Sequence, residues 1–281
     1  MARQELGYES STPIQVPTAL SNGGVSMRSL VQALKVGQNF LLDSLPRTEL
    51  DRLEVYLEPV YFPLGKTICE SGERVDYCYF PTNSVISMLY TMRDGSTAEM
   101  GLVGNDGVTG VAALLGGGST CSRAVVAVAG DAIKLPAKQL QKEFMLPGPL
   151  QTLLLRYTQA FITQVSQTAV CNRLHSVEQR LCRLLLLCHD RTIRSDLLMT
   201  QELIAHMLGG RRESVTVAAG RLQDAGLIHY CRGRINILDR EGLESCACEC
   251  YRIVEDEVDR LFSRKRKSDF SRVEPFWEAA G

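Results

Sequence analysis

Four side chains of one short segment have the chemistry needed to recognise the edges of DNA base pairs. Arg212 can form two parallel hydrogen bonds with guanine, and Glu213 can accept a hydrogen bond from cytosine. Thr216 and Val217 carry methyl groups that can contact the methyl group of thymine. At 100° per residue these side chains share or flank one face of a helix. The spacing therefore predicts contact with double-stranded DNA, with Arg211 assigned to a phosphate or to the helix start.

Two helices joined by a tight turn are predicted to position these side chains. The first helix follows Thr200, whose hydroxyl can accept a hydrogen bond from a free amide at the helix start. Gly209 and Gly210 then supply the turn, because glycine tolerates the positive φ that such a turn often needs. The second helix, from about residue 211 to 224, has an apolar face opposite the base-reading face. That buried face is predicted to consist of Val215, Ala218, Ala219 and Leu222.

A short β-hairpin is predicted after the second helix. Apolar residues alternate on both sides of a turn at Gly233, and Arg232 and Arg234 would lie at the tip, where they can contact phosphate groups. Residues 211–234 contain five arginines and two acidic residues, a local charge of +3 in a chain whose net charge is −1. This contrast favours sequence-selective binding over general coating of nucleic acid. An ordinary helical hairpin with solvated arginines is the alternative.

The segment LGGRRESVTVAAGRLQDAGLI, followed by RGRINILD, resembles the C-terminal winged helix-turn-helix of the Crp/Fnr family of bacterial transcription regulators. In that family the recognition helix begins with Arg-Glu, which corresponds to Arg212 and Glu213. A second recognition arginine often stands at the position of Val217, so the family's usual operator half-site is not assumed for this chain. The predicted DNA-binding residues are Thr200, Arg211, Arg212, Glu213, Ser214, Thr216, Val217, Arg232 and Arg234.

Residues 39–144 are predicted to form a β-roll after a short helix at residues 45–57, because glycines punctuate short apolar segments. The segment GKTICESGERVDYCYFPTNSVISMLY resembles the cyclic-nucleotide-binding β-roll. Residues 107–128 correspond to the phosphate-binding cassette of that fold, and Arg123 matches the arginine that clamps the cyclic phosphate. The resemblance thus implies that the candidate effector-binding residues are Gly107, Gly110, Ser122 and Arg123.

The cassette argues against a cyclic nucleotide as the ligand. Val108 stands where nucleotide-binding members carry a Glu that bonds the ribose hydroxyl, and Ala124 replaces the usual Ser or Thr. The glycine-rich loop and Arg123 could still form a phosphate nest for another small effector. A protein with no tight ligand, in which Arg123 makes a structural ion pair or is solvated, is the other interpretation. No cofactor is assigned.

A long helix is predicted to connect the two domains over residues 147–174. Leu150, Leu154, Tyr157 and Phe161 follow a 4-3-4 spacing that is typical of a coiled-coil seam. We expect this stripe to pack against a second copy of the chain and give a symmetric homodimer. Its two recognition helices would then lie about 34 Å apart, one turn of DNA. Packing of the stripe within its own subunit is the alternative.

Ten cysteines are scattered along the chain and do not indicate disulfides in a cytosolic protein. Cys246, Cys248 and Cys250 lie in a segment that is predicted to be helical, where Cys246 and Cys250 would share a face and Cys248 would point away. Three ligands would then not converge, so no metal site is predicted. His175 is expected to make a polar contact at a helix junction. A redox- or metal-gated regulator that senses through its cysteines is the alternative function.

The predicted fold class is α+β: an N-terminal β-roll (jelly-roll, cyclic-nucleotide-binding-like), a long central dimerisation helix and a C-terminal winged helix-turn-helix. The expected divisions are a disordered tail at 1–36, the β-roll at 37–146, the dimerisation helix at 147–175, the DNA-binding domain with a C-terminal helix at 176–265 and a tail at 266–281.

The expected partners are double-stranded DNA and a second copy of the chain, with RNA polymerase and a small effector as further candidates. No apolar run of about 20 residues and no signal pattern occur in the sequence, so neither a membrane partner nor export is expected and the predicted location is cytoplasmic. No catalytic triad, paired carboxylates or His-rich metal spacing stands out, so no enzyme is expected.

Overall fold

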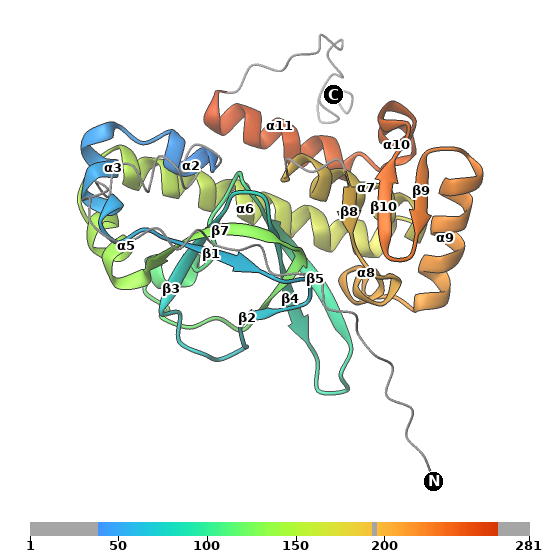
Figure 1. Cartoon of the computed structure of the whole chain (residues 1–281), viewed down its shortest axis with the longest axis horizontal. Coiled ribbons are helices and arrows are strands. Elements are labelled where there is room, and N and C mark those ends of the chain that lie inside the picture. Colours follow the sequence, from blue (N-terminus) through green and yellow to red (C-terminus); the bar gives the residue numbers. More distant parts are fainter. Residues whose placement is uncertain (1–38, 193–195, 264–281) are drawn as a thin grey trace, which may run out of the picture.

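A computed structural model describes residues 39–192 and 196–263 of the chain. The tails predicted at 1–36 and 266–281 lie outside these residues. Within the described ranges a β-roll comes first, a long helix follows, and a smaller domain of helices with its own sheet comes last (Figure 1). The predicted α+β architecture is confirmed.

The β-roll consists of two antiparallel sheets, with strand orders β1-β7-β3 and β2-β6-β4-β5. Apolar side chains from both sheets, among them Phe62, Ile86 and Val126, form a buried cluster. The strands are β1 Glu58–Phe62, β2 Thr67–Cys69, β3 Tyr77–Pro81, β4 Val85–Thr91, β5 Thr97–Val103, β6 Arg123–Val128 and β7 Gly130–Pro136. Short helices flank them: α2 Phe40–Asp43, α3 Arg47–Glu54, α4 Val111–Leu114 and α5 Ala137–Phe144.

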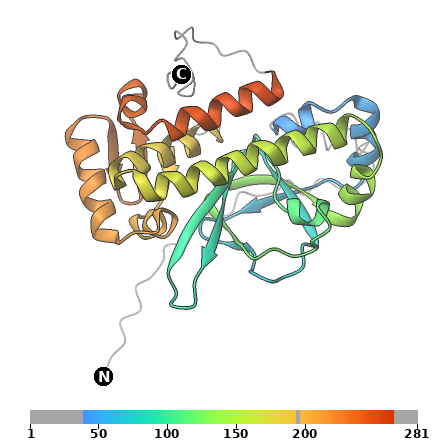
Figure 2. The ribbon, with the colours of Figure 1, turned by 180° about the vertical axis from the view of Figure 1, so that it is seen from behind.

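The long helix α6, Pro149–Leu174, runs along the molecule from the β-roll to the C-terminal domain (Figure 2). Leu150, Leu154 and Tyr157 are buried among apolar side chains of the chain's own β-roll and its short helices. The prediction that this stripe forms the dimer seam is therefore wrong. The periodicity of this stripe correctly marks a buried face, but that face packs against the β-roll of the same subunit and not against a second copy of the chain.

A second stripe on α6 faces away from the β-roll. Leu155 and Ile162 are 50% and 54% exposed, which is high for large apolar side chains on a regular helix. Exposed residues recur along this face with alternating spacings of three and four, the spacing of a coiled-coil seam. They are Thr152, Leu155, Gln159, Ile162, Ser166, Ala169 and Arg173. This stripe, which we call the outer stripe, is the face that is left for a partner.

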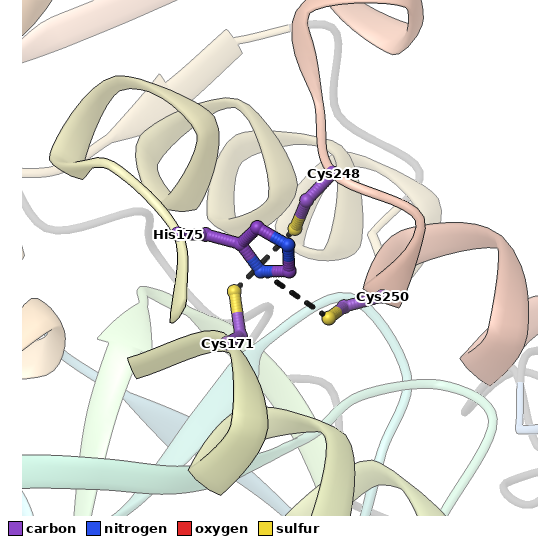
Figure 3. A group of neighbouring side chains, drawn as sticks. All are labelled: Cys171, His175, Cys248 and Cys250. Atoms are coloured by element: carbon purple, nitrogen blue, oxygen red, sulfur yellow. Dashed lines mark hydrogen bonds between the residues drawn. The ribbon is translucent and has the colours of Figure 1, made fainter. Parts of the chain in front are cut away.

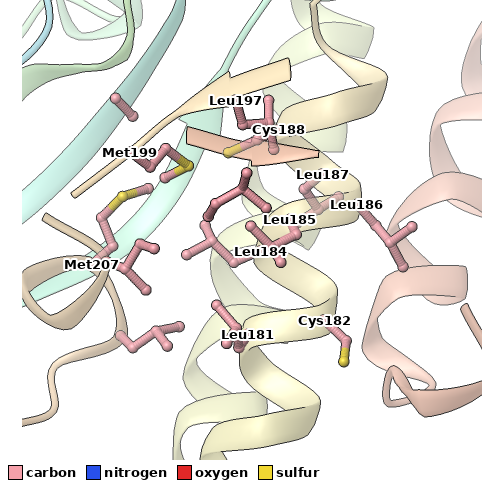
Figure 4. Close-up of a cluster of buried hydrophobic side chains, with 14 of the residues drawn as sticks. Leu181, Cys182, Leu184, Leu185, Leu186, Leu187, Cys188, Leu197, Met199 and Met207 are labelled. Carbon is pink, nitrogen blue, oxygen red and sulfur yellow. The ribbon is translucent and has the colours of Figure 1, made fainter. Parts of the chain in front are cut away.

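The C-terminal domain is arranged around α7, Val177–Asp190, in which every residue from Leu181 to Cys188 is buried (Figure 4). A helix buried all round must have neighbours on every side. Here they are the β-roll, the helix-turn-helix and the two last helices. The other elements are β8 Asp196–Leu198, α8 Gln201–Leu208, α9 Arg212–Asp224, β9 Ile228–Cys231, β10 Arg234–Ile237, α10 Arg240–Cys246 and α11 Cys250–Phe262.

The β-roll and the C-terminal domain share one hydrophobic core. Leu89, Leu102 and Val125 of the β-roll belong to the same buried cluster as Leu184 of α7 and Met207 of α8. A polar contact supplements this packing, because the hydroxyl of Thr97 donates a hydrogen bond of 3.3 Å to the carbonyl oxygen of His206. The first helix of the helix-turn-helix therefore rests directly on strand β5.

The segment that contains the C-x-C-x-C run is not one helix, so that prediction is wrong. Helix α10 ends at Cys246, Ala247 has extended backbone angles (φ −73°, ψ 158°), and α11 begins at Cys250. The break lets α10 pack against α7 while α11 packs along α6. Cys246 is consequently exposed, whereas Cys248 and Cys250 are buried.

Candidate nucleic-acid interface

The turn between α8 and α9 forms through the local interactions that its sequence predicts. The hydroxyl of Thr200 accepts a hydrogen bond of 3.1 Å from the amide of Leu203 and caps α8. Gly209 follows the last residue of α8 and lies in the left-handed region, with φ +58°. That conformation favours glycine and turns the chain sharply into α9.

Helix α9 has one buried face and one exposed face. Val215, Ala218, Ala219 and Leu222 are all at most 4% exposed and pack in the core of the domain. Glu213, Thr216 and Val217 are exposed on the other face, as are Arg211, Arg212 and Ser214 at the helix start. Val217 is 56% exposed although it is apolar. The predicted division of the helix into a packing face and an outward face is confirmed.

Thr216 on the outward face of α9 contacts α8. The hydroxyl of Thr216 lies 2.9 Å from Oε1 of Gln201 and 3.0 Å from the carbonyl oxygen of Arg212. Helix α9 is joined to the hairpin at Gln223, whose Oε1 accepts a hydrogen bond of 2.8 Å from the amide of Tyr230. Gln201 was not identified from the sequence, because its role depends on the crossing of α8 and α9.

A groove of about 450 Å³ borders the outward face of α9 and the start of α7. Ser176, Glu178 and Arg221 lie along it, and Nη1 of Arg221 is 3.4 Å from Oε2 of Glu178. Glu213, Ser214 and Val217 form its other side. The start of α7 thus lies beside the predicted base-reading residues, which the sequence does not indicate because residues 176 and 213 are distant in the chain.

The hairpin is part of a three-stranded sheet with order β8-β10-β9, and strand β8 was not predicted. Arg232 and Gly233 form its tip with positive φ values of 49° and 77°, as a tight two-residue turn requires. Arg234 begins β10, and its Nη1 lies 2.5 Å from Oδ2 of Asp196 in β8. The two arginines therefore differ: Arg232 is at the tip, whereas an acidic neighbour offsets the charge of Arg234.

The predicted effector residues in the β-roll have structural partners. Nη2 of Arg123 donates a 2.7 Å hydrogen bond to the hydroxyl of Thr67, and its Nε lies 3.2 Å from Oε2 of Glu70. Ser122 is buried, and its hydroxyl lies 2.8 Å from that of Thr120. These contacts agree with the interpretation of Arg123 as a residue of a structural ion pair.

The glycines of the cassette and Val108 have other roles. Gly107 lies against α6, where an added Cβ would be 2.6 Å from the hydroxyl oxygen of Tyr157. Gly110 precedes α4, and Val108 is 1% exposed within the core. An effector site that contains Gly107, Gly110, Ser122 and Arg123 remains a prediction.

Comparison with known proteins identifies both domains of the chain. A cyclic nucleotide-binding domain model matches residues 59–145, and a Crp-like helix-turn-helix domain model matches residues 179–246. The chain is 26% identical over 212 residues to the global nitrogen regulator of Synechococcus elongatus, which covers 72% of this chain and 94% of that protein.

Solved structures share the fold at lower identity. FixK2 from Bradyrhizobium japonicum superposes with a TM-score of 0.57 at 15% identity, over 68% of this chain and 98% of that one. A CRP-family transcriptional regulator from Thermus thermophilus gives a TM-score of 0.56 at 21% identity, over 67% and 96%.

The described residues contain no helix that is long and apolar enough to span a membrane.

The order of a cyclic-nucleotide-binding-like β-roll, a long helix and a Crp-like helix-turn-helix, together with the matches to both domain models, has one consistent explanation. The chain belongs to the Crp/Fnr family of DNA-binding transcription regulators.

Proposed function

We propose that the chain acts as a homodimer that recognises a two-fold-symmetric operator, with one α9 helix of each subunit in the major groove. The observation that carries the proposal is the exposed face of α9, where Arg212, Glu213, Thr216 and Val217 project from a helix whose opposite face is fully packed. Arginine and glutamate can distinguish G·C pairs, and the methyl groups of Thr216 and Val217 suit thymine.

Phosphate contacts are assigned to groups around this helix. Arg232 at the hairpin tip and Arg211 at the start of α9 are exposed cations. Their role is to add affinity and fix the register on the duplex without reading sequence. Arg234 contributes less than Arg232, because Asp196 already pairs with it.

The dimer is proposed to form through the outer stripe of α6. Leu155, Ile162 and Ala169 recur every seven residues on this face, which supports lengthwise packing of two α6 helices; we assign them a parallel orientation about a two-fold axis. Gln159 and Ser166 lie between them, so the seam is partly polar. A symmetric pair would place the two α9 helices about one turn of DNA apart.

The same proposal places the protein in the cytoplasm, with RNA polymerase as a partner at the promoter and a small effector as a candidate ligand of the β-roll. No catalytic step is assigned to the chain. The Xanthomonas campestris regulator CLP, described as c-di-GMP responsive, has the same fold with a TM-score of 0.54, but at 14% identity it supports no ligand for this chain.

Selection of binding sites from random duplexes by the purified full-length chain tests this function. The expected result is an enriched site with two-fold symmetry and half-sites one helical turn apart, bound by two chains. Footprinting of the selected site should show protection on both half-sites. Binding without sequence preference, or binding by a monomer, would contradict the proposal.

A further inference from the structure

Four side chains from two distant segments converge at the end of α6 (Figure 3). Cys171 lies in the last turn of α6, and His175 is the first residue after that helix. Cys248 lies in the break between α10 and α11, and Cys250 is the first residue of α11. One ligand atom from each of the four residues lies within 4.8 Å of all the others.

The distances within this cluster match the edges of a tetrahedral metal site. The Sγ atoms of Cys171 and Cys248 are 3.4 Å apart, and Sγ of Cys250 is 3.6 Å from Nδ1 of His175. Bond lengths of about 2.3 Å to sulfur and about 2.1 Å to nitrogen give edges of about 3.8 Å and about 3.6 Å in a tetrahedral zinc site. The side chains therefore need little movement to surround an ion.

The surroundings of the cluster also suit a structural metal. Cys171, Cys248 and Cys250 are at most 4% exposed and form a separate buried cluster. Nδ1 of His175 faces the thiols, while its Nε2 lies 3.3 Å from Oε2 of Glu249. A carboxylate at the far nitrogen is the usual arrangement for a histidine ligand, because it holds the ring orientation and selects the tautomer.

We propose that Cys171, His175, Cys248 and Cys250 form a structural site for one zinc ion or a similar borderline-soft divalent cation. Three thiolates and a neutral imidazole complete a four-coordinate shell, which is the composition of closed structural zinc sites. On binding, each thiol releases its proton to the solvent and its sulfur forms a bond to the metal. Such a site carries a net negative charge. The buried, positively charged Arg183 lies nearby, and its charge favours the thiolate forms of Cys171 and Cys250.

The position of the site assigns it a role within the fold. His175 follows the last residue of α6 and Ser176 caps α7, so the cluster lies at the junction between the long helix and the DNA-binding domain. The metal ties this junction to the connection between α10 and α11. It thereby adds a cross-link to the packing of α11 along α6 and helps to fix the DNA-binding domain relative to α6.

The test is the metal content and the cobalt spectrum of the full-length chain purified under reducing conditions. We expect about one zinc per chain after reconstitution and dialysis. Replacement of zinc by Co²⁺ should give strong visible bands of tetrahedral coordination and a thiolate-to-cobalt charge-transfer band in the near ultraviolet. Metal well below one equivalent per chain, or a cobalt spectrum without the charge-transfer band, would overturn the proposal.

Single substitutions separate the proposed ligands from their neighbours. C248S and C250S should each lose most of the bound metal, whereas C246S, which changes an exposed thiol two residues away, should retain it. H175C supplies a fourth thiolate and should keep the metal while strengthening the charge-transfer band. Equal loss of metal in C246S and C248S would refute the assignment.

Two further measurements keep the result unambiguous. If the serine variants do not fold, release of metal from the wild-type chain by a thiol-reactive reagent, followed with a colorimetric metal indicator, still reports on cysteine ligation. A Cys171–Cys248 disulfide in a chain that binds no metal after reduction would overturn the proposal. These readouts involve no DNA, so their outcome is independent of the proposed operator recognition.

Discussion

Nε of Arg191 lies 3.1 Å from Oδ2 of Asp106, and this ion pair joins the end of α7 to the β-roll. The side chain of Arg191 is only 3% exposed, and the amide of Asn105 donates a 3.3 Å hydrogen bond to its carbonyl oxygen. The pair lies beside the apolar core that the two domains share. Any reorientation of the DNA-binding domain relative to the β-roll must therefore either separate Arg191 from Asp106 or move both residues together.

Substitution D106A should destabilise the protein by about 3–5 kcal/mol, because it removes the carboxylate that pairs with the buried guanidinium of Arg191. The measurement is the free energy of unfolding in urea. The control is D76A, since the pair between Arg74 and Asp76 is 67% exposed on both sides and contributes little. Similar free energies of unfolding for D106A and D76A would show that the ion pair between Arg191 and Asp106 does not stabilise the fold.

Glu99 should make stability depend on pH. It is buried on β5, and burial raises its pKa from 4.5 to about 7, although Arg183, the hydroxyl of Ser87 and Arg191 oppose the shift. The folded state thus binds the proton more tightly than the unfolded state. The contribution of protonated Glu99 to the stability of the folded state is fully present below pH 4.5 and is lost as the pH rises to about 7.

Substitution E99Q isolates this effect, because glutamine can still accept the 3.0 Å hydrogen bond from Ser87. The free energy of unfolding of the wild type should fall by up to about 3 kcal/mol, relative to that of E99Q, between pH 4.5 and pH 7. Parallel pH profiles of the two proteins would mean that Glu99 does not titrate in this range.

Arg212 and Arg232 should differ in what they contribute to DNA binding. R212A should lose about 1–3 kcal/mol at the selected site and relax the preference there. R232A should weaken binding to all sequences alike and reduce the salt dependence of binding by about one unit of slope. Fluorescence anisotropy on the selected and a scrambled duplex, over a range of salt concentrations, measures both. If R212A kept the wild-type ratio between the two duplexes, Arg212 would not read a base.

Substitution I162E should convert a dimer into a monomer, because it places two carboxylates at the centre of the outer stripe. Sedimentation equilibrium gives the mass directly. V55E is the matched control. Val55 is also an exposed aliphatic residue, 64% exposed, but it lies just after α3 and is not part of the outer stripe. A dimeric I162E variant with wild-type affinity for its partner would place the interface elsewhere.

The helix-turn-helix could be predicted in detail because its signals are local. The Thr200 cap, the Gly209 turn and the apolar spacing of α9 each involve residues within one or two helical turns of each other. Periodicity also located α6 almost to its ends. Strand β8 was missed because three residues carry no period, and its pairing partner β10 lies more than 30 residues away.

The sequence by itself determined the order of the domains, the recognition helix and its outward residues, because short-range backbone and side-chain preferences decide these features. Only the tertiary structure decided which stripe of α6 is buried, since an apolar face does not specify what covers it. It also decided that Cys171 meets Cys248 across 77 positions. Such contacts depend on how whole helices pack and on a helix break at Ala247, which no local spacing of cysteines reveals.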